Sequence, residues 1–483
     1  MWLVEKSDEM PDTDDGKEQS GPRQPLSSEN EPRQAVAVAL ASPIPQMGMR
    51  ALLDTRWVNQ YLSPLKRNAI TSLAASMLGQ TALAVTGILG ARMLGPTNRG
   101  YLALISLVPF VLSQLGTLGL PLAITYFVAR DRSTGADVFR SIVRPAITQC
   151  TGLSLVQVVV LVLLLHDVPT PIKLAASLVV IVLPFMVVHE YGLAFLQGQG
   201  RYHAFNALRS SPYVLYAILM IAVFLLGADR IHVVLAVWVI ASVSAAILTV
   251  NAARLGIQKK CTQLEAPTLP VMYAFGLKAL LGSVGPLEAL RLDQLLIGVL
   301  LPPHQLGLYV AAAAVSYFPR VLVQGIGFIA YPHIASTSNA AAQWRSTRRF
   351  LLWTVLMAGS VALLLAAAAP VIIPSFFGPE FSSAVVTARI LLIGSTMLGV
   401  RRILGDCVRG MGSALDNTVA EVASSLCLVP ALIVIAPRWG IEGVALGFTG
   451  AAAFGLMILL TLTARDRKGR SAKPSEFEEP LDG

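Results

Sequence analysis

The chain has 483 residues, of which 54% are hydrophobic and only 13% are charged, and its formal net charge is +9. A soluble chain of this length would form two or three domains and would carry about twice that share of charged residues. Instead, the sequence contains many apolar runs of about 18 residues or more, the length at which a helix crosses a bilayer. These runs are continuous and not alternating, which excludes an outer-membrane barrel. The composition therefore predicts an all-α polytopic membrane protein.

The residues that carry most enzymatic chemistry do not occur in recognisable patterns. The 4 cysteines have neither metal-ligand spacing nor the spacing of a disulfide framework. The sequence has no P-loop, no HExxH motif and no dinucleotide-binding glycine motif after a strand. We therefore expect no enzymatic activity, no cofactor and no metal site.

The apolar runs divide the chain into bundles and tails. Residues 1–60 are rich in Asp, Glu, Ser, Pro and Gln, which predicts a disordered cytoplasmic tail. About twelve spans follow, at 69–91, 102–127, 145–166, 174–197, 212–228, 232–253, 274–300, 306–334, 351–373, 385–408, 418–436 and 442–464. We expect an N-terminal six-helix bundle over 61–255, a cytoplasmic linker over 256–272, a C-terminal six-helix bundle over 273–464 and a second disordered cytoplasmic tail over 465–483.

Basic residues fall mainly in the loops after the even-numbered spans. These loops include Arg130, Arg132, Arg254 and Lys259, whereas the opposite loops hold few arginines and lysines. Cytoplasmic loops carry the excess of positive charge in membrane proteins, so both termini are predicted to be cytoplasmic. This placement accounts for the net positive charge, and no nucleic-acid partner is expected.

Two pairs of sequence motifs repeat at the same offset. LGPTNRGYLALISLVPF (94–110) is echoed by LPPHQLGLYVAAAAVSYFP (301–319), and LQGQGR (196–201) by VRGMGS (408–413). Both offsets are about 210 residues, so the two pairs share one frame. Six spans separate the copies, an even number, so the halves have the same orientation. We predict two parallel six-helix repeats around a central cavity, as in transporters whose repeats are related by an axis along the membrane normal.

The stretch 273–301, predicted as one spanning helix, carries charge near the middle of the membrane. Arg291 lies about 13 Å of helix from Leu300, and an arginine at that depth costs at least about 2.5–3.5 kcal/mol. We therefore predict that Arg291 faces a wet cationic cavity. Glu288 and Asp293 lie in the same stretch, and Glu288 stands at i−3, so an ion pair with a structural role is the alternative.

Other charged residues in or beside spans are weaker candidates. In the tenth span, Arg402 and Asp406 share one face and Arg401 is adjacent, although an arginine there could also extend to the membrane surface. The remaining basic candidate from the residues alone is Arg320, which follows Pro319. Acidic residues in spans could bind a coupling ion or pair with arginines, and the candidates are Glu288, Asp293, Asp406 and Glu190.

Several motifs resemble one family of membrane exporters. ARMLGPTNRGY (91–101), RLDQLLIG (291–298), LGLYVAAAA (306–314), RGMG (409–412) and GIEGVALG (440–447) are similar to motifs of the Wzx-like polysaccharide exporters. That family belongs with the lipid II (MurJ-like) and multidrug (MATE) exporters. The resemblance covers about residues 65–464. It also adds Arg92 to the candidates, because MurJ-like and Wzx-like exporters place a basic residue at the end of the first span.

The resemblance implies a flippase of the bacterial inner membrane. Its expected substrate is an undecaprenyl-pyrophosphate-linked oligosaccharide, moved to the outer leaflet by alternating access for export of a cell-surface polysaccharide. Its expected partners are this polyprenyl-pyrophosphate-linked sugar, membrane lipid, and a polysaccharide polymerase with its export machinery. A lipid II flippase is the first alternative. A cation-coupled multidrug exporter is the second, and the arginines disfavour it because cationic drugs need acidic and aromatic groups.

Overall fold

The computed structural model describes residues 55–132, 135–255, 267–283, 290–337 and 339–472. The chain divides into two compact units, Met1–Leu65 and Lys66–Gly483, and the fold below is that of the second unit. The first helix begins at Thr55, inside the range predicted as a tail. Residues 1–54, most of the predicted linker and the last residues of the chain lie outside the described ranges.

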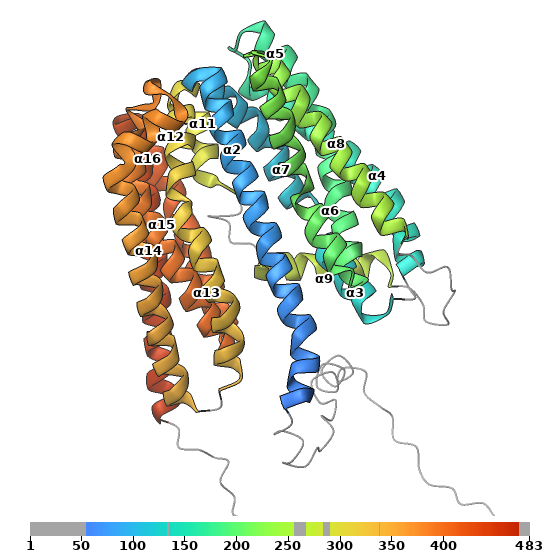
Figure 1. Ribbon diagram of the computed structural model, residues 1–483, viewed down its shortest axis with the longest axis vertical. Coiled ribbons are helices and arrows are strands. Elements are labelled where there is room, and N and C mark those ends of the chain that lie inside the picture. Colours follow the sequence, from blue (N-terminus) through green and yellow to red (C-terminus); the bar gives the residue numbers. More distant parts are fainter. Residues whose placement is uncertain (1–54, 133–134, 256–266, 284–289, 338, 473–483) are drawn as a thin grey trace, which may run out of the picture. The chain divides into compact units, whose positions relative to one another are not determined.

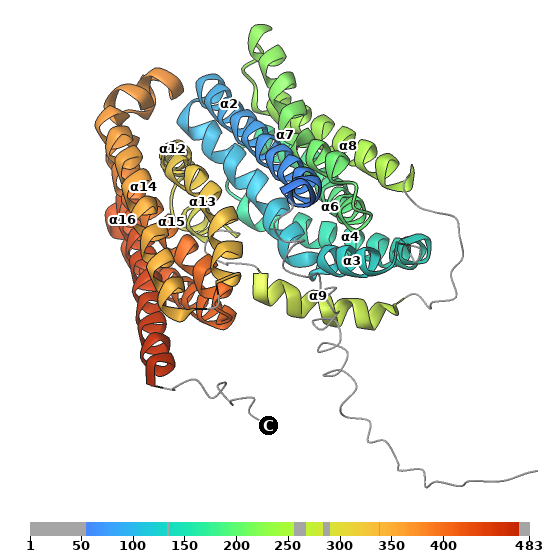
Figure 2. The same ribbon diagram turned by 60° about the horizontal axis from the view of Figure 1, so that its bottom comes forward.

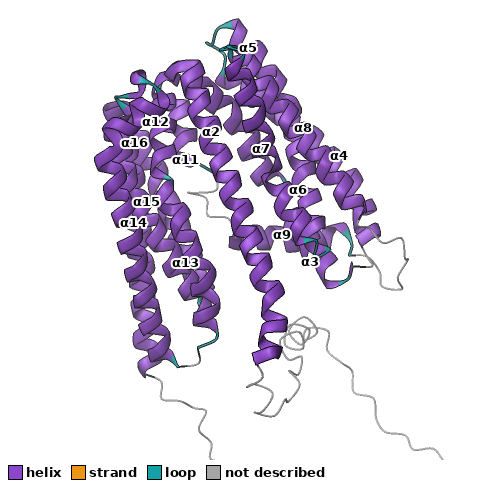
Figure 3. Ribbon diagram, viewed as in Figure 1, coloured by secondary structure: helices purple, strands orange, loops and turns teal. Residues whose placement is uncertain are grey.

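All regular elements of the described ranges are helices, as predicted (Figures 1 and 3). They are α2 (Thr55–Gly116), α3 (Leu120–Arg130), α4 (Gly135–Leu164), α5 (Thr170–Ser177), η3 (Leu178–Ile181), α6 (Val182–Gly198), α7 (Tyr202–Leu225), α8 (Ile231–Leu255), α9 (Leu269–Ser283), α11 (Leu292–Leu300), α12 (Pro303–Ser316), α13 (Phe318–Ala335), α14 (Ala340–Phe377), η4 (Pro379–Phe381), α15 (Ala384–Gly410) and α16 (Ala414–Ala472).

Within these ranges, 9 helices are long and apolar enough to cross a membrane. Two of them, with 46 and 52 residues, are long enough to cross twice, because a helix rises about 1.5 Å per residue and the hydrocarbon layer is about 30 Å thick. Each turns sharply at a glycine with positive φ, at Gly95 (φ 65°) in α2 and at Gly440 (φ 56°) in α16. Glycine is required there because a side chain disfavours that backbone conformation. Together with the interrupted segment α9–α11, this agrees with the predicted count of about twelve spans.

The stretch predicted as one helix over 273–301 is interrupted, so that prediction was wrong. Helix α9 ends at Ser283, and α11 begins only at Leu292, after Arg291 in a left-handed conformation (φ 47°). Leu290 and Arg291 form a turn, and residues 284–289 lie outside the described ranges. With only 9 residues, α11 is too short to cross the membrane.

Helix α9 packs on α3 of the N-terminal half. The rings of Tyr126 and Phe275 stack with centroids 4.5 Å apart. At the start of α3, Gly119 and Gly276 approach so closely that a Cβ on Gly276 would lie 2.7 Å from the Gly119 carbonyl oxygen. Figure 2 shows α9 beside α3.

The remaining helices pack mainly within two groups (Figure 1). Helix α6 packs against α3, α4, α7 and α8, while α15 packs against α12, α13, α14 and α16. The largest buried apolar cluster takes residues from both groups, for example Ile105 of α2 and Tyr309 of α12. These groups follow the two predicted repeats except at α9, which was predicted in the second bundle and packs against α3. A cavity opens beside α6.

Candidate functional site: an arginine-lined cavity

A cavity of ≈ 300 Å³ lies between helices of the N-terminal group and the short helix α11. Helices α2, α6, α7 and α8 supply most of its wall, and α11 and α12 contribute at one side. On α6 it is lined by Phe185 and by a set of four residues, Met186, His189, Glu190 and Leu193. Their i, i+3, i+4, i+7 spacing places them on one face of the helix.

Three arginines from three different segments line the cavity: Arg99 of α2, Arg209 of α7, and Arg291 just before α11. The Arg291 guanidinium lies 5.2 Å from the centre of the Phe110 ring, a distance at which a cation is attracted to an aromatic face. The break in the helix positions Arg291, because its left-handed backbone ends the turn from which α11 starts.

The other two arginines are held by contacts of their own. Arg209 donates hydrogen bonds from Nη2 to Ser76 Oγ (2.8 Å) and to the Ser72 carbonyl oxygen (3.3 Å). The side chain of Arg99 lies along α2 beside Gly90, where a Cβ would be 3.9 Å from its Cδ and Nε. The cavity therefore presents three guanidinium groups, which suit oxyanions because their planar fork can form two parallel hydrogen bonds.

Glu190 is the one carboxylate among the described residues that line the cavity. Its neighbour His189 is buried, and His189 Nδ1 lies 2.9 Å from Thr249 Oγ1. Three arginines against one glutamate leave an excess of positive charge. No group of three His, Cys, Asp or Glu side chains among the described residues is placed to hold a metal ion.

Polar aromatic residues complete the wall. Tyr213, Tyr216 and Trp238 line the cavity together with Gln294 and Ser242. Tyrosine and tryptophan combine an apolar ring with a hydrogen-bonding group. The cavity thus offers both positive charge and side chains able to contact a polar, uncharged part of a ligand.

Not all residues predicted as site candidates lie in this cavity. Arg291 and Glu190 line it. Arg92 is exposed, and it donates from Nε to the Phe376 carbonyl oxygen (2.9 Å) and from Nη2 to that of Ser375, at the end of α14. Glu288, the predicted alternative partner of Arg291, lies outside the described residues.

The other candidates are in the C-terminal group. Arg401 is buried and forms an ion pair with Glu421 of α16. Asp406 pairs with Arg409, and Arg402 is exposed.

The last two candidates are on α11 and α13. Asp293 is buried and accepts a hydrogen bond from Tyr309 Oη at 2.7 Å. The Arg320 guanidinium lies 4.5 Å from the centre of the Tyr317 ring.

Arg99 and Arg209 were assigned to loops by sequence reasoning, and both line the cavity. The span containing Arg209 was predicted to begin at residue 212, whereas α7 begins at Tyr202, two turns before the arginine. Arg99 follows the turn at Gly95 by four residues and therefore lies on the helix and not before it. The signal that could have found them is the set of polar residues at helical spacing before each apolar run.

The repeated motifs meet where α2 and α12 cross. A Cβ on Gly100 would lie 2.6 Å from the carbonyl carbon of Pro303. In the second copy of the motif, a Cβ on Gly307 would lie 2.8 Å from the carbonyl carbon of Pro96. The two glycines are equivalent in the repeat, so they form one reciprocal backbone contact between the two halves.

The long apolar helices define a multi-pass membrane protein, and its fold is similar to the folds of solved transporters and of a flippase. A solved structure of the lipid II flippase MurJ in an inward closed conformation is similar, with 14% identity, 82% of this chain and 87% of that chain covered, and a TM-score of 0.60. An inward-facing MATE multidrug transporter has 14% identity, covers 84% of this chain and 100% of that one, and gives a TM-score of 0.62. An outward-facing MATE transporter gives 0.54, with 12% identity and coverages of 84% and 96%.

The sequence defines the family more closely. The model of the family described as "Polysaccharide biosynthesis protein" matches residues 65–338, which is more than half of the chain, and the chain belongs to that family. No curated protein matches it by sequence. The matched family is one of polysaccharide biosynthesis, and the similar solved structures are a flippase and multidrug transporters.

Proposed function

We propose that the protein is a flippase of the bacterial inner membrane that translocates an undecaprenyl-pyrophosphate-linked oligosaccharide for export of a cell-surface polysaccharide. The observation that carries this proposal is the convergence of Arg99, Arg209 and Arg291 on one cavity with a single carboxylate. Arginines within membrane-spanning segments mark substrate pathways, since contact with lipid is costly. A diphosphate is the group whose charge and geometry match several guanidinium forks.

The rest of the cavity suits the sugar that such a lipid carries. Tyr213, Tyr216, Trp238 and Gln294 would contact hydroxyl groups and ring faces, while the arginines bind the diphosphate. In an alternating-access cycle the cavity would open to one side of the membrane at a time. Both termini would lie in the cytoplasm, as the basic loops indicate. A polysaccharide polymerase and its export machinery would receive the flipped lipid.

Lipid II carries the same diphosphate, so a lipid II flippase remains the second candidate. The excess of positive charge disfavours a cation-coupled multidrug exporter, because a cationic drug would be repelled by the three arginines. Deletion of the gene distinguishes these three candidate functions. Accumulation of a lipid-linked oligosaccharide would support the proposal, and accumulation of lipid II would support the second candidate. Unchanged lipid carriers with drug sensitivity would support the third.

The variant Arg291→Ala tests the cavity itself. We expect it to reach the membrane in normal amounts and to lose export of the polysaccharide, with partial activity in Arg291→Lys, which keeps the charge but not the fork. The matched control is Arg140→Ala, whose side chain is 80% exposed and far along the sequence from the cavity residues. Unchanged surface polysaccharide in the Arg291→Ala strain would remove this arginine from the mechanism.

A further inference from the structure

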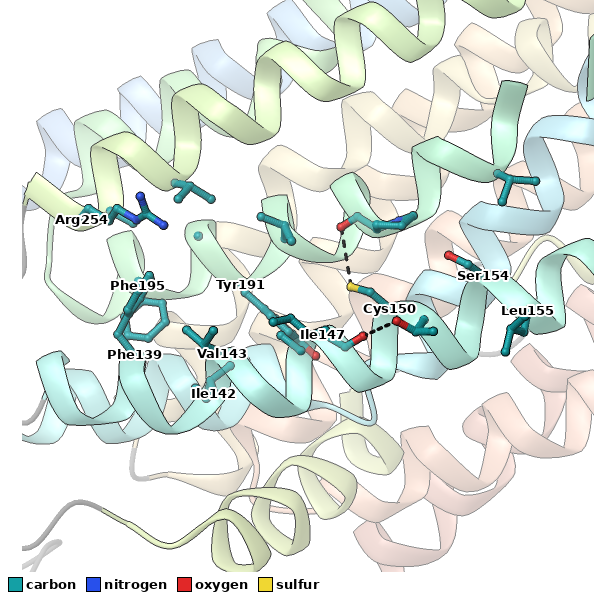
Figure 4. Close-up of a pocket in the computed structure, with 18 of the residues that line it drawn as sticks. Phe139, Ile142, Val143, Ile147, Cys150, Ser154, Leu155, Tyr191, Phe195 and Arg254 are labelled. Atoms are coloured by element: carbon teal, nitrogen blue, oxygen red, sulfur yellow. Dashed lines mark hydrogen bonds between the residues drawn. The ribbon is translucent and has the colours of Figure 1, made fainter. Parts of the chain in front are cut away.

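A second, larger hollow of ≈ 640 Å³ lies between α4, α6 and α8 (Figure 4). On α6 it is lined by Pro184, Val188, Tyr191, Gly192 and Phe195. These residues occupy a different face of α6 from those that line the arginine cavity. We call this hollow the α4 groove.

The α4 groove follows α4 over most of its length. Its lining residues on that helix run from Phe139 to Val158. The 19 helical steps between these two residues correspond to about 28 Å, close to the thickness of about 30 Å of a bilayer's hydrocarbon layer. The acyl chain of a phospholipid belongs to one leaflet and would fill about half of this length. A chain that fills the groove must therefore be longer than one leaflet.

The wall of the α4 groove is almost wholly apolar, and part of it is accessible from outside. Val143, Ile147 and Leu155 are exposed large apolar residues on α4. Ala146 and Cys150 lie between them with short side chains, which leaves room for an inserted chain. Tyr191 Oη points to Gln149, to which it donates a hydrogen bond, so its polar group is already satisfied.

One charged residue, Arg254, is found among the described residues that line the α4 groove. It belongs to the last turn of α8, and its guanidinium lies 5.8 Å from the centre of the Phe139 ring. Figure 4 shows Arg254 beside Phe139 and Phe195, at the opposite end of the groove from Leu155. The adjacent loops are basic, so the positive-inside rule places this end at the cytoplasmic surface. An apolar channel with a cation at its membrane-surface end fits a long hydrocarbon chain that carries a phosphate.

We propose that the α4 groove binds the isoprenoid tail of a polyprenyl diphosphate, with the diphosphate at Arg254, before the head enters the arginine cavity. The proposal rests on the proposed function for the nature of the transported lipid. The length of the groove favours an isoprenoid chain over a phospholipid, and the single arginine at its cytoplasmic end supplies a partner for the phosphate.

Photo-crosslinking from within the groove tests this. A benzophenone amino acid is placed at Ile147, which lines the groove and is 61% exposed, or at Leu163 of the same helix, which is 68% exposed and does not line it. The full chain is reconstituted in phosphatidylglycerol nanodiscs that contain undecaprenyl diphosphate, and the adducts are identified by mass. We expect an undecaprenyl diphosphate adduct at position 147 and phospholipid adducts at position 163. Phospholipid adducts alone at both positions, or equal undecaprenyl adducts at both, would overturn the proposal.

Two further variants test the parts of the site. Arg254→Gln should lower the adduct yield with undecaprenyl diphosphate about tenfold, since a charge-assisted contact is lost, and should leave the yield with uncharged undecaprenol unchanged. Ala146→Phe should abolish both adducts by filling the groove, with the thermal unfolding temperature measured to show that the protein is folded. If Arg254→Gln lowers neither yield, the phosphate is not held there and the proposal fails.

A translocation assay in vesicles distinguishes this proposal from the proposed function. Translocation of the lipid-linked oligosaccharide without any groove adduct would refute the groove and leave the function standing. A groove adduct without translocation would refute the function and leave the tail site standing.

Discussion

The contact between Gly100 and Gly307 makes a quantitative prediction about how the two halves separate. A Cβ on Gly100 would lie 2.6 Å from the carbonyl carbon of Pro303 and 3.1 Å from the Gly307 nitrogen. The Pro303 carbonyl oxygen would lie closer still, and ordinary contacts between carbon atoms are about 3.5–4.0 Å, so α2 and α12 would have to move apart by at least about 1 Å. Both sides are backbone and cannot rotate away. Over-packing of this kind costs about 1–3 kcal/mol. This cost would lower the ratio of the closed to the open state at the crossing of α2 and α12 roughly 5- to 150-fold.

Disulfide formation across the crossing measures that ratio. Thr97 Oγ1 and His304 Nδ1 lie 3.4 Å apart, so the pair Thr97→Cys with His304→Cys in a background without native cysteines reports on closure. Gly100→Ala should slow formation of this disulfide, and Gly307→Ala should act in the same direction. The control is Gly359→Ala on α14, where an added Cβ meets nothing within 4 Å. Equal rates of disulfide formation with and without Gly100→Ala would show that the glycines do not determine how closely α2 and α12 pack in the closed state.

Three more outcomes follow from the contacts of Arg401, Tyr309 and Arg92. Arg401→Met should destabilise the protein by about 3–5 kcal/mol, because it leaves Glu421 buried without its ion-pair partner; thermal unfolding in detergent checks this, and the double variant with Glu421→Leu should recover most of the loss. Tyr309→Phe removes the hydrogen bond to buried Asp293 and should cost about 1–3 kcal/mol in the same measurement, a value that would be near zero if another donor replaced the hydroxyl. Arg92→Gln should leave the unfolding temperature almost unchanged, because Arg92 is exposed and its carbonyl partners can bind water instead.

The class of fold was predictable because a bilayer restricts the choices of the chain. Long apolar runs without water must satisfy their backbone hydrogen bonds internally, so hydropathy located most of the spans. The repeat at about 210 residues also makes Gly100 and Gly307 equivalent positions of the motif. It did not predict that the two glycines lie at one contact between the halves. The left-handed turn at Arg291 was missed, since apolar residues dominate the stretch 273–301.

The candidate site was predicted only in part, because helix boundaries were predicted from hydrophobicity, and polar residues at the start of a helix were therefore assigned to loops. Arg209 precedes the apolar part of α7 and was therefore assigned to a loop, although the helix begins earlier and carries the side chain into the cavity. The ion pair of Arg401 is formed with Glu421 of the next helix. No spacing rule within one helix could have identified a partner that only tertiary packing brings near.

The hydrogen bonds of Arg92 bear on the reversibility of the conformational cycle. The guanidinium binds the last carbonyl groups of α14, which a helix cannot satisfy within itself. If the two halves part, water can take over both the cation and these carbonyl groups, because Arg92 is exposed. Such an exchange of bonds is nearly balanced in free energy. The hydrogen bonds of Arg92 therefore align the two halves in the closed state but add little free energy that would oppose their separation.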